Sequence, residues 1–94
     1  MQQKKRVMLV DDDSDFVAMN RSVLEQAGYE VVAAHSAREC LERVVTEGPD
    51  ILVLDVMMES EHSGFDLSLE LQRRRETRHI PIVLATAIGR NPRD

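Results

Sequence analysis

The sequence has little cysteine, no excess of positive charge and no long apolar run, and each shortage excludes a class of protein. A single cysteine, Cys40, rules out an internal disulfide and fits a reducing compartment. The formal net charge of −5 argues against a nucleic-acid-binding surface. No apolar run approaches the length of a membrane span, and the N-terminus lacks the apolar core of a signal peptide. We therefore expect a cytoplasmic protein without a membrane segment.

The length predicts one small domain over residues 1–94, since the sequence contains no internal repeat, low-complexity segment or interdomain linker. Hydrophobic residues make up 43% of the chain, which favours a folded protein over a disordered one.

Short apolar runs alternate with segments of helical periodicity along the whole chain. The runs predict strands over residues 6–10, 29–34, 51–54 and 80–85. The segments between them predict helices over residues 14–27, 37–47 and 64–75. This alternation is typical of an α/β fold, in which a parallel sheet carries helices on both faces and right-handed crossovers restrict the topology.

Each predicted helix has an apolar side that we expect to face the sheet. The residues assigned to these sides are Phe16, Val17, Val23, Leu24 and Ala27 in the first helix, Cys40, Leu41, Val44 and Val45 in the second, and Phe65, Leu67, Leu69 and Leu71 in the third. The third helix ends in a basic run, Arg73, Arg74, Arg75, Arg78 and His79, which favours a solvated helix end, with partner docking as the alternative.

Polar residues that can cap a helix stand at the predicted helix ends. Asp13 or Ser14 can cap the first helix, and Ser36 with Glu39 matches a capping box for the second. Gly48 ends the second helix, since glycine tolerates the left-handed conformation.

Carboxylates and a hydroxyl stand where three of the predicted strands end. Asp11, Asp12 and Asp13 follow the first strand, Asp55 follows the third, and Thr86 follows the fourth. Ligands of open parallel sheets bind beyond the carboxyl ends of the strands. Neighbouring carboxylates repel each other, and a hard cation such as Mg²⁺, which takes oxygen ligands, would offset this repulsion. The simpler interpretation, that the acids only open a helix, is the one we adopt for Asp13.

The order and spacing of these motifs resemble the receiver domain of two-component response regulators. The motifs are Leu-Val-Asp-Asp-Asp at 9–13, Asp-Val-Met-Met at 55–58, Gly-Phe-Asp-Leu at 64–67 and Ile-Val-Leu-Ala-Thr-Ala at 82–87. The match extends from Val7 to Ala87. The resemblance implies a flavodoxin-like, three-layer αβα fold with a parallel sheet ordered 2-1-3-4-5, of which this chain holds the strands 2-1-3-4.

The resemblance also implies a role for each site residue. Asp55 matches the phosphoacceptor, which takes a phosphoryl group from a sensor histidine kinase or a phosphotransfer protein. Asp11, Asp12, Asp55 and the backbone carbonyl of Met57 match the ligands of Mg²⁺, and Thr86 matches the hydroxyl that binds the phosphoryl oxygen and moves on activation. Such a domain is a regulatory module that switches an output domain or partner, not an enzyme acting on other substrates.

Two features depart from the family pattern. In the loop after Asp55, Glu59 replaces the usual proline and the glycine comes one residue later; Glu61 and His62 also lie there, and an ordinary surface loop is the simplest interpretation. The sequence also stops before the family's fourth helix, fifth strand and fifth helix, and no lysine follows Lys5 to match the family's phosphate-binding lysine. We therefore expect an incomplete receiver whose fourth strand is an exposed edge, open to dimerisation.

Two other functions fit part of the pattern. Asp11 and Asp13 resemble the Asp-x-Asp motif of haloacid-dehalogenase-type phosphatases, with Asp11 as nucleophile, Asp13 as general acid and Thr86 as a second-motif hydroxyl. This alternative leaves Asp55 without a role. The third possibility is a receiver-like scaffold that binds partners without phosphorylation, against which the three acids and Thr86 together weigh.

Overall fold

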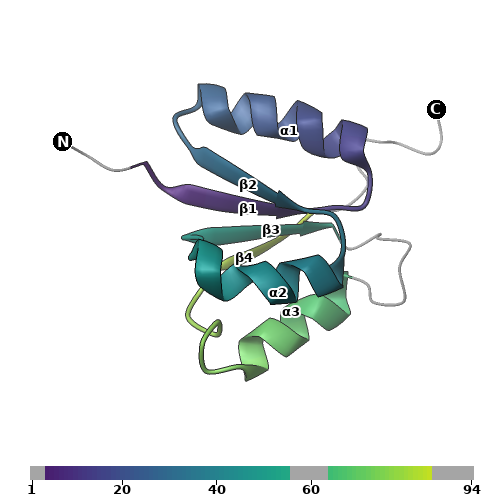
Figure 1. Ribbon diagram of the computed structural model, residues 1–94, viewed down its shortest axis with the longest axis vertical. Helices are drawn as coiled ribbons and strands as arrows, with labels where there is room; N and C mark the ends of the chain where they lie inside the picture. Colours follow the sequence, from purple (N-terminus) through teal and green to yellow (C-terminus); the bar gives the residue numbers. More distant parts are fainter. Residues whose placement is uncertain (1–3, 56–63, 86–94) are drawn as a thin grey trace.

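Four parallel strands form a sheet that lies between one helix and a pair of helices (Figure 1). The structure, a computed structural model, describes residues 4–55 and 64–85. In these residues the elements are β1 (Arg6–Val10), α1 (Ser14–Gln26), β2 (Glu30–Ala34), α2 (Ala37–Glu47), β3 (Ile51–Asp55), α3 (Gly64–Arg73) and β4 (Ile82–Ala85). The strand order is β2-β1-β3-β4, with every pair parallel. This is a flavodoxin-like, three-layer αβα arrangement, and the predicted fold and strand order 2-1-3-4 are confirmed.

The two faces of the sheet are covered unequally. On the α2 and α3 side lies the larger core, whose buried residues are Met8, Val10, Ala34, Ala37, Cys40, Val44, Leu52, Leu54, Leu67, Leu71 and Ile80. On the other side α1 lies over a smaller group, Leu9, Val17 and Val31, with Leu24, Ala33 and Val53 partly buried against it. The central strands β1 and β3 therefore contribute side chains to both cores, which explains their unbroken apolar runs.

The predicted inward faces are wrong at five positions, because each helix buries a narrower stripe than its apolar residues suggest. Val23, Val45, Phe65 and Leu69 are 57 to 61% exposed, and Ala27 is exposed too. Each residue of an α-helix is rotated by about 100° around the helix axis from the one before it. Leu24, seven residues after Val17, therefore lies on the same side of α1 as Val17, whereas Val23 does not.

The apolar residues of α3 illustrate the same geometry most clearly. Phe65, Leu67, Leu69 and Leu71 are spaced two apart, and on a helix this spacing splits them between two faces. Leu67 and Leu71 are buried, at 2% and 0% exposure, whereas Phe65 and Leu69 lie outside at 59% and 57%. The predicted single apolar side of α3 is therefore two opposed i, i+4 pairs.

The element ends agree with the sequence-based limits to within two residues, and the caps explain them. Asp13 is the N-cap of α1, and its Oδ1 accepts hydrogen bonds from the backbone N–H groups of Asp15 and Phe16 at 3.0 and 3.1 Å. Ser36 caps α2 by accepting from the N–H of Glu39, as predicted. Gly48 ends α2 in the left-handed region at φ 58°. Strand β4 starts at Ile82, two residues later than predicted, and α3 ends at Arg73, two residues earlier.

The free edge of β2 is closed by two arginines that come from opposite faces of the sheet. Arg21 of α1 donates from Nη2 to the carbonyl of Val31 at 3.2 Å, and Arg43 of α2 donates from Nη1 to the carbonyl of Ala33 at 2.5 Å. These guanidinium groups already bond to two of the edge carbonyls and place charge where another strand would have to pair. Edge strands need such protection against pairing with other chains.

Within residues 4–55 and 64–85, no helix combines the length and the apolar character needed to cross a bilayer.

Candidate functional site

Three carboxylates meet at the carboxyl edge of the sheet. Strand β1 ends at Val10 and β3 ends at Asp55, and the pairing of Val10 with Leu54 places the next residues, Asp11 and Asp55, side by side. One carboxylate oxygen from each of Asp11, Asp12 and Asp55 lies within 4.8 Å of the other two. Asp11 and Asp55 are 4% and 3% exposed, whereas Asp12 is exposed to solvent. The structure thus brings together the three acids that the sequence assigned to one site.

Local hydrogen bonds hold Asp11 in this position. Its backbone N–H donates to the carbonyl of Ala34 at 3.0 Å, which continues the pairing of β1 with β2 beyond the strand end. Its Oδ1 accepts from the backbone N–H of Asp13 at 2.9 Å. The acidic run therefore has two roles. Asp11 and Asp12 join Asp55 in the cluster of three carboxylates, while Asp13 caps α1, as predicted.

The cluster of three carboxylates, from Asp11, Asp12 and Asp55, fits a small divalent cation. Two unit negative charges 4.8 Å apart repel by about 3.5 kcal/mol at an effective dielectric constant of about 20. Oxygen ligands on opposite sides of a Mg²⁺ or Ca²⁺ ion are roughly 4 to 5 Å apart, so that the spread of these three oxygens suits such an ion. A cation there would turn the mutual repulsion of the three acids into attraction.

A small cavity of about 70 Å³ opens between the acids and α1. It is lined by Leu9, Val10, Asp11, Phe16, Val17, Asn20, Val53, Asp55 and Ala85. Sequence reasoning missed Asn20, whose side-chain amide donates to the carbonyl of Phe16 at 2.8 Å. Its spacing of three residues from Val17 was the available signal, because that spacing places both on one side of α1.

The remaining predicted site residues, Met57 and Thr86, lie outside the described residues, as do Glu59, Glu61 and His62. Strand β4 nevertheless ends at the site, since its last residue, Ala85, is paired with Asp55.

Cys40 takes no part in this site. The residue is fully buried in the core beneath α2, and burial raises the pKa of its thiol to about 12. A neutral, inaccessible thiol behaves as a small apolar side chain, which confirms the interpretation of Cys40 as a core residue.

The comparison with known sequences gives one family for nearly the whole chain. Residues 7–93 match the family model described as "Response regulator receiver domain". The alkaline phosphatase synthesis transcriptional regulatory protein PhoP of Bacillus subtilis is 35% identical over 83 residues, which are 88% of this chain and 33% of PhoP. The polar-differentiation response regulator DivK of Brucella ovis is 32% identical over 85 residues, covering 90% of this chain and 68% of DivK. The chain thus spans about a third of PhoP and two thirds of DivK.

Solved structures agree with this assignment. The N-terminal domain of a response regulator receiver protein from Methanoculleus marisnigri superposes with a TM-score of 0.84 at 33% identity, covering 94% of this chain and 71% of that one. The chemotaxis protein CheY4 of Vibrio cholerae superposes with a TM-score of 0.80 at 28% identity, covering 87% and 68%.

Proposed function

The chain belongs to the response regulator receiver domain family of two-component signalling, and from this premise we propose that it accepts a phosphoryl group on Asp55 in a Mg²⁺-dependent reaction. Receiver domains are regulatory phosphoacceptors that bind Mg²⁺ at an acidic pocket. The observation that carries the proposal is the grouping of Asp55 with Asp11 and Asp12 within 4.8 Å at the carboxyl edge of the sheet.

The proposed reaction is an attack by an Asp55 carboxylate oxygen on the phosphorus of a phosphohistidine. The new O–P bond forms as the P–N bond breaks, and the histidine keeps the electron pair of the broken bond. Phosphoryl transfer depends mainly on positioning and on neutralisation of charge. Bound Mg²⁺ would supply that neutralisation between the carboxylate and the phosphoryl oxygens.

The residues around Asp55 are held in fixed positions. Asp11 offers a carboxylate that the N–H of Asp13 holds in place at 2.9 Å, and Asp12 offers a second one that is open to solvent. Asp55 extends β3 and is paired with Ala85, so that its backbone is fixed by the sheet. Preorganised groups of this kind need little rearrangement when charge develops.

The backbone carbonyl of Met57 and the hydroxyl of Thr86 complete the proposed site. Met57 follows Asp55 by two residues, and Thr86 directly follows Ala85, which is paired with Asp55. We assign the carbonyl to Mg²⁺ and the hydroxyl to a phosphoryl oxygen. Phosphorylation adds negative charge and acceptor oxygens, and movement of Thr86 toward them would transmit the change.

The proposed partners are a sensor histidine kinase or a phosphotransfer protein on the input side and an output domain or protein on the other. We place this exchange in the cytoplasm, and the free, buried Cys40 is consistent with a reducing compartment.

A dimer through the edge of β4 is a further part of the proposal. Val83 and Leu84 are 46% and 37% exposed, on opposite faces of this strand, and no charged residue interrupts its sequence. The β2 edge differs, because Arg21 and Arg43 occupy its carbonyls. Light scattering coupled to size-exclusion chromatography tests the dimer, and a Val83→Lys variant should be monomeric.

The central experiment is incubation with Mg²⁺ and acetyl phosphate, followed by intact mass measurement and peptide mapping. We expect one added phosphoryl group on Asp55, absent in Asp55→Asn and retained in Asp66→Asn, which changes an exposed acid of α3. Phosphate on Asp11 would instead support a haloacid-dehalogenase-type phosphatase, although Asp13, its required general acid, is engaged in capping α1. Absence of any modification would favour a phosphorylation-independent scaffold.

A further inference from the structure

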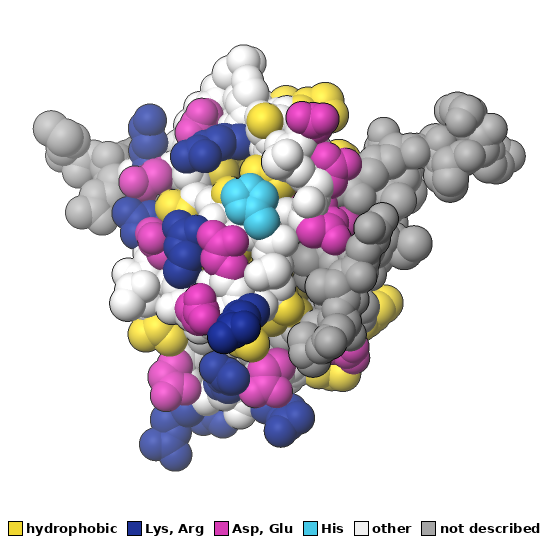
Figure 2. Space-filling view, turned by 45° about the vertical axis from the view of Figure 1, so that its right-hand side comes forward, with side chains coloured by type: hydrophobic (Ala, Val, Ile, Leu, Met, Phe, Trp, Pro, Cys, Tyr) yellow, Lys and Arg dark blue, Asp and Glu magenta, His cyan; other side chains and the backbone are white. Residues whose placement is uncertain are grey.

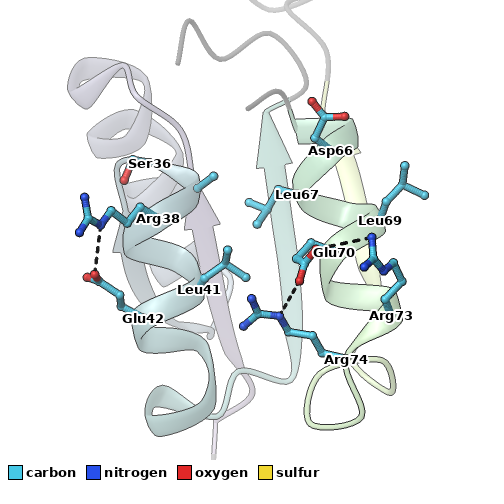
Figure 3. Close-up of a pocket in the computed structure, with 11 residues that line it drawn as sticks. Ser36, Arg38, Leu41, Glu42, Asp66, Leu67, Leu69, Glu70, Arg73 and Arg74 are labelled. Carbon is cyan, nitrogen blue, oxygen red and sulfur yellow. Dashed lines mark hydrogen bonds and ion pairs between the residues drawn. The ribbon is translucent and has the colours of Figure 1, made fainter. Parts of the chain in front are cut away.

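A groove runs between α2 and α3 on the face of the molecule opposite α1 (Figure 3). Its volume is about 920 Å³, and its lining residues are Ser36, Ala37, Arg38, Leu41, Glu42, Asp66, Leu67, Leu69, Glu70, Arg73 and Arg74. Leu41 of α2 and Leu67 of α3 point toward each other across its floor (Figure 3). The groove is thus apolar at its base and charged along both rims.

Apolar residues of both helices remain open to solvent beside this floor. Val45 follows Leu41 by four residues, which puts both on one side of α2, and it is 61% exposed. Leu69 lines the groove from α3 and is 57% exposed. Exposed apolar side chains that extend a groove with charged rims are typical of binding surfaces for other proteins.

The two helices that form the walls of the groove differ in their balance of charge. On α2, Arg38 and Glu42 form a balanced pair at 3.4 Å. On α3, the single carboxylate of Glu70 serves both Arg73 at 3.8 Å and Arg74 at 2.9 Å, and the hydrogen bond from Arg74 lowers the pKa of Glu70. This end of the groove therefore keeps an excess of positive charge.

The basic end continues beyond the groove, while its other end has no such excess of positive charge, since Arg38 is paired with Glu42 there. Arg75 and Arg78 follow α3, are exposed, and form no ion pair with the residues in 4–55 and 64–85. Figure 2 shows lysine and arginine side chains gathered at the lower end of the molecule, where α3 ends in Figure 1. Asp66 lies in the first turn of α3, at the opposite end. The protein as a whole carries a net charge of −5, so that this basic end stands out from its surroundings.

We propose that the groove docks an amphipathic helix of a partner protein, with acidic residues at its N-terminal end and an apolar stripe along its length. Helices seat in grooves of this kind through apolar residues at i, i+3, i+4 and i+7. Acidic residues at the N-terminal end of that helix face Arg73 and Arg74, and its C-terminal end faces Asp66. The docked helix is then antiparallel to α2 and α3, which also opposes its dipole to theirs.

A partner helix fits the groove better than a second copy of the chain. Helix α1 has exposed Met19 and Val23 and an acidic start, so that it shares part of this chemistry. However, Asp13 is already engaged as the cap of α1 and Asp12 belongs to the carboxylate cluster of the candidate site, which leaves Asp15 as the one acid at the start of α1 to face Arg73 and Arg74. An acidic helix end supplied by another protein is free of both tasks.

The test uses two labelled synthetic peptides of about 14 residues, a length that covers the groove. The two peptides have the same amino-acid composition, and each forms a helix with a stripe of leucines. The first peptide has glutamates at its N-terminal end and lysines at its C-terminal end, and the second has the reverse arrangement. Fluorescence anisotropy is measured without Mg²⁺ or a phosphodonor, so that the result does not depend on Asp55. We expect the first peptide to bind at least about tenfold more tightly than the second.

Three variants make the test specific to the groove. Leu69→Glu, at an exposed position, should lower the affinity about tenfold while circular dichroism stays unchanged. The double change Arg73→Glu and Arg74→Glu should reverse the preference between the peptides. The matched control, Lys4→Glu with Lys5→Glu, makes the same charge change at exposed residues outside the groove and should leave the preference as it was.

Three results would overturn the proposal. Equal affinity for the two peptides, or a preference that survives the change at Arg73 and Arg74, would show that the groove does not select an acidic helix end. Self-association in sedimentation velocity that Leu69→Glu abolishes would assign the groove to a second copy of the chain.

Discussion

Replacing Asp55 with asparagine should stabilise the protein when no divalent cation is present. The oxygens of Asp55 and Asp11 lie within 4.8 Å of each other, and both side chains are buried. Two unit charges at that separation repel by about 3.5 kcal/mol at an effective dielectric constant of about 20. Asparagine has nearly the shape of aspartate without its charge, so that the packing is kept. We expect a gain of about 1 to 3 kcal/mol after hydrogen-bond losses.

Urea unfolding in EDTA, followed by circular dichroism, measures this gain. Titration with Mg²⁺ then provides the complementary result, because a ligand that binds only the folded state stabilises it in proportion to the logarithm of its concentration. The wild type should gain more stability from Mg²⁺ than Asp55→Asn does. Glu76→Gln, at an exposed position outside the helices, is the control and should lie within about 0.5 kcal/mol of the wild type in EDTA. A variant at Asp55 that is less stable than the wild type in EDTA would refute the reasoning from charge repulsion.

Three further predictions follow from other parts of the structure. Cys40 should react with a thiol reagent in the native protein only as fast as the fold opens, because its thiol is buried and its pKa is raised to about 12. Arg43→Ala should cost about 1 to 2 kcal/mol and promote aggregation through the freed β2 edge, whereas Arg38→Ala, 89% exposed, should cost less than about 0.5 kcal/mol in the same urea titration. The pKa of Glu39 is lowered from 4.5, chiefly by the backbone N–H of His35 and then by Arg43, so its contribution to stability is present above pH 4.5 and lost as the pH falls through the lowered pKa. The stability difference between wild type and Glu39→Gln should therefore shrink on acidification below that pH, and a constant difference would contradict the assignment.

Local patterns in the sequence were sufficient to predict the strands and most of the helix caps. The central strands β1 and β3 are continuous apolar runs that end on carboxylates, and burial of both sheet faces requires such runs. Asp13 and Ser36 cap their helices as predicted, because capping depends on residues within one turn. The common position of Asp11 and Asp55 also followed from the alternation of elements, since parallel strands end at one edge.

Other features depended on contacts between residues far apart in the sequence. The protection of the β2 edge by Arg21 and Arg43 was not predictable, since each arginine reaches a carbonyl ten residues away on another element. The burial of Thr77, 1% exposed with its hydroxyl donating to the carbonyl of Leu71 at 2.7 Å, gave no periodic signal either. Such bonds satisfy buried polar groups only once the chain has folded around them.

The amino-acid sequence by itself determined the α/β alternation, the parallel sheet and the set of acids at its carboxyl edge. These features follow from periodicity and from the direction of the chain, which are local properties. Only the tertiary structure decided which side of each helix is buried, because the sheet covers a narrow stripe of every helix. It left Val45 and Leu69 exposed beside the groove between α2 and α3, where the same apolar spacing had indicated a core. Whether an apolar residue lies in the core or on the surface thus depends on which other elements pack against it, and residue spacing alone does not determine this packing.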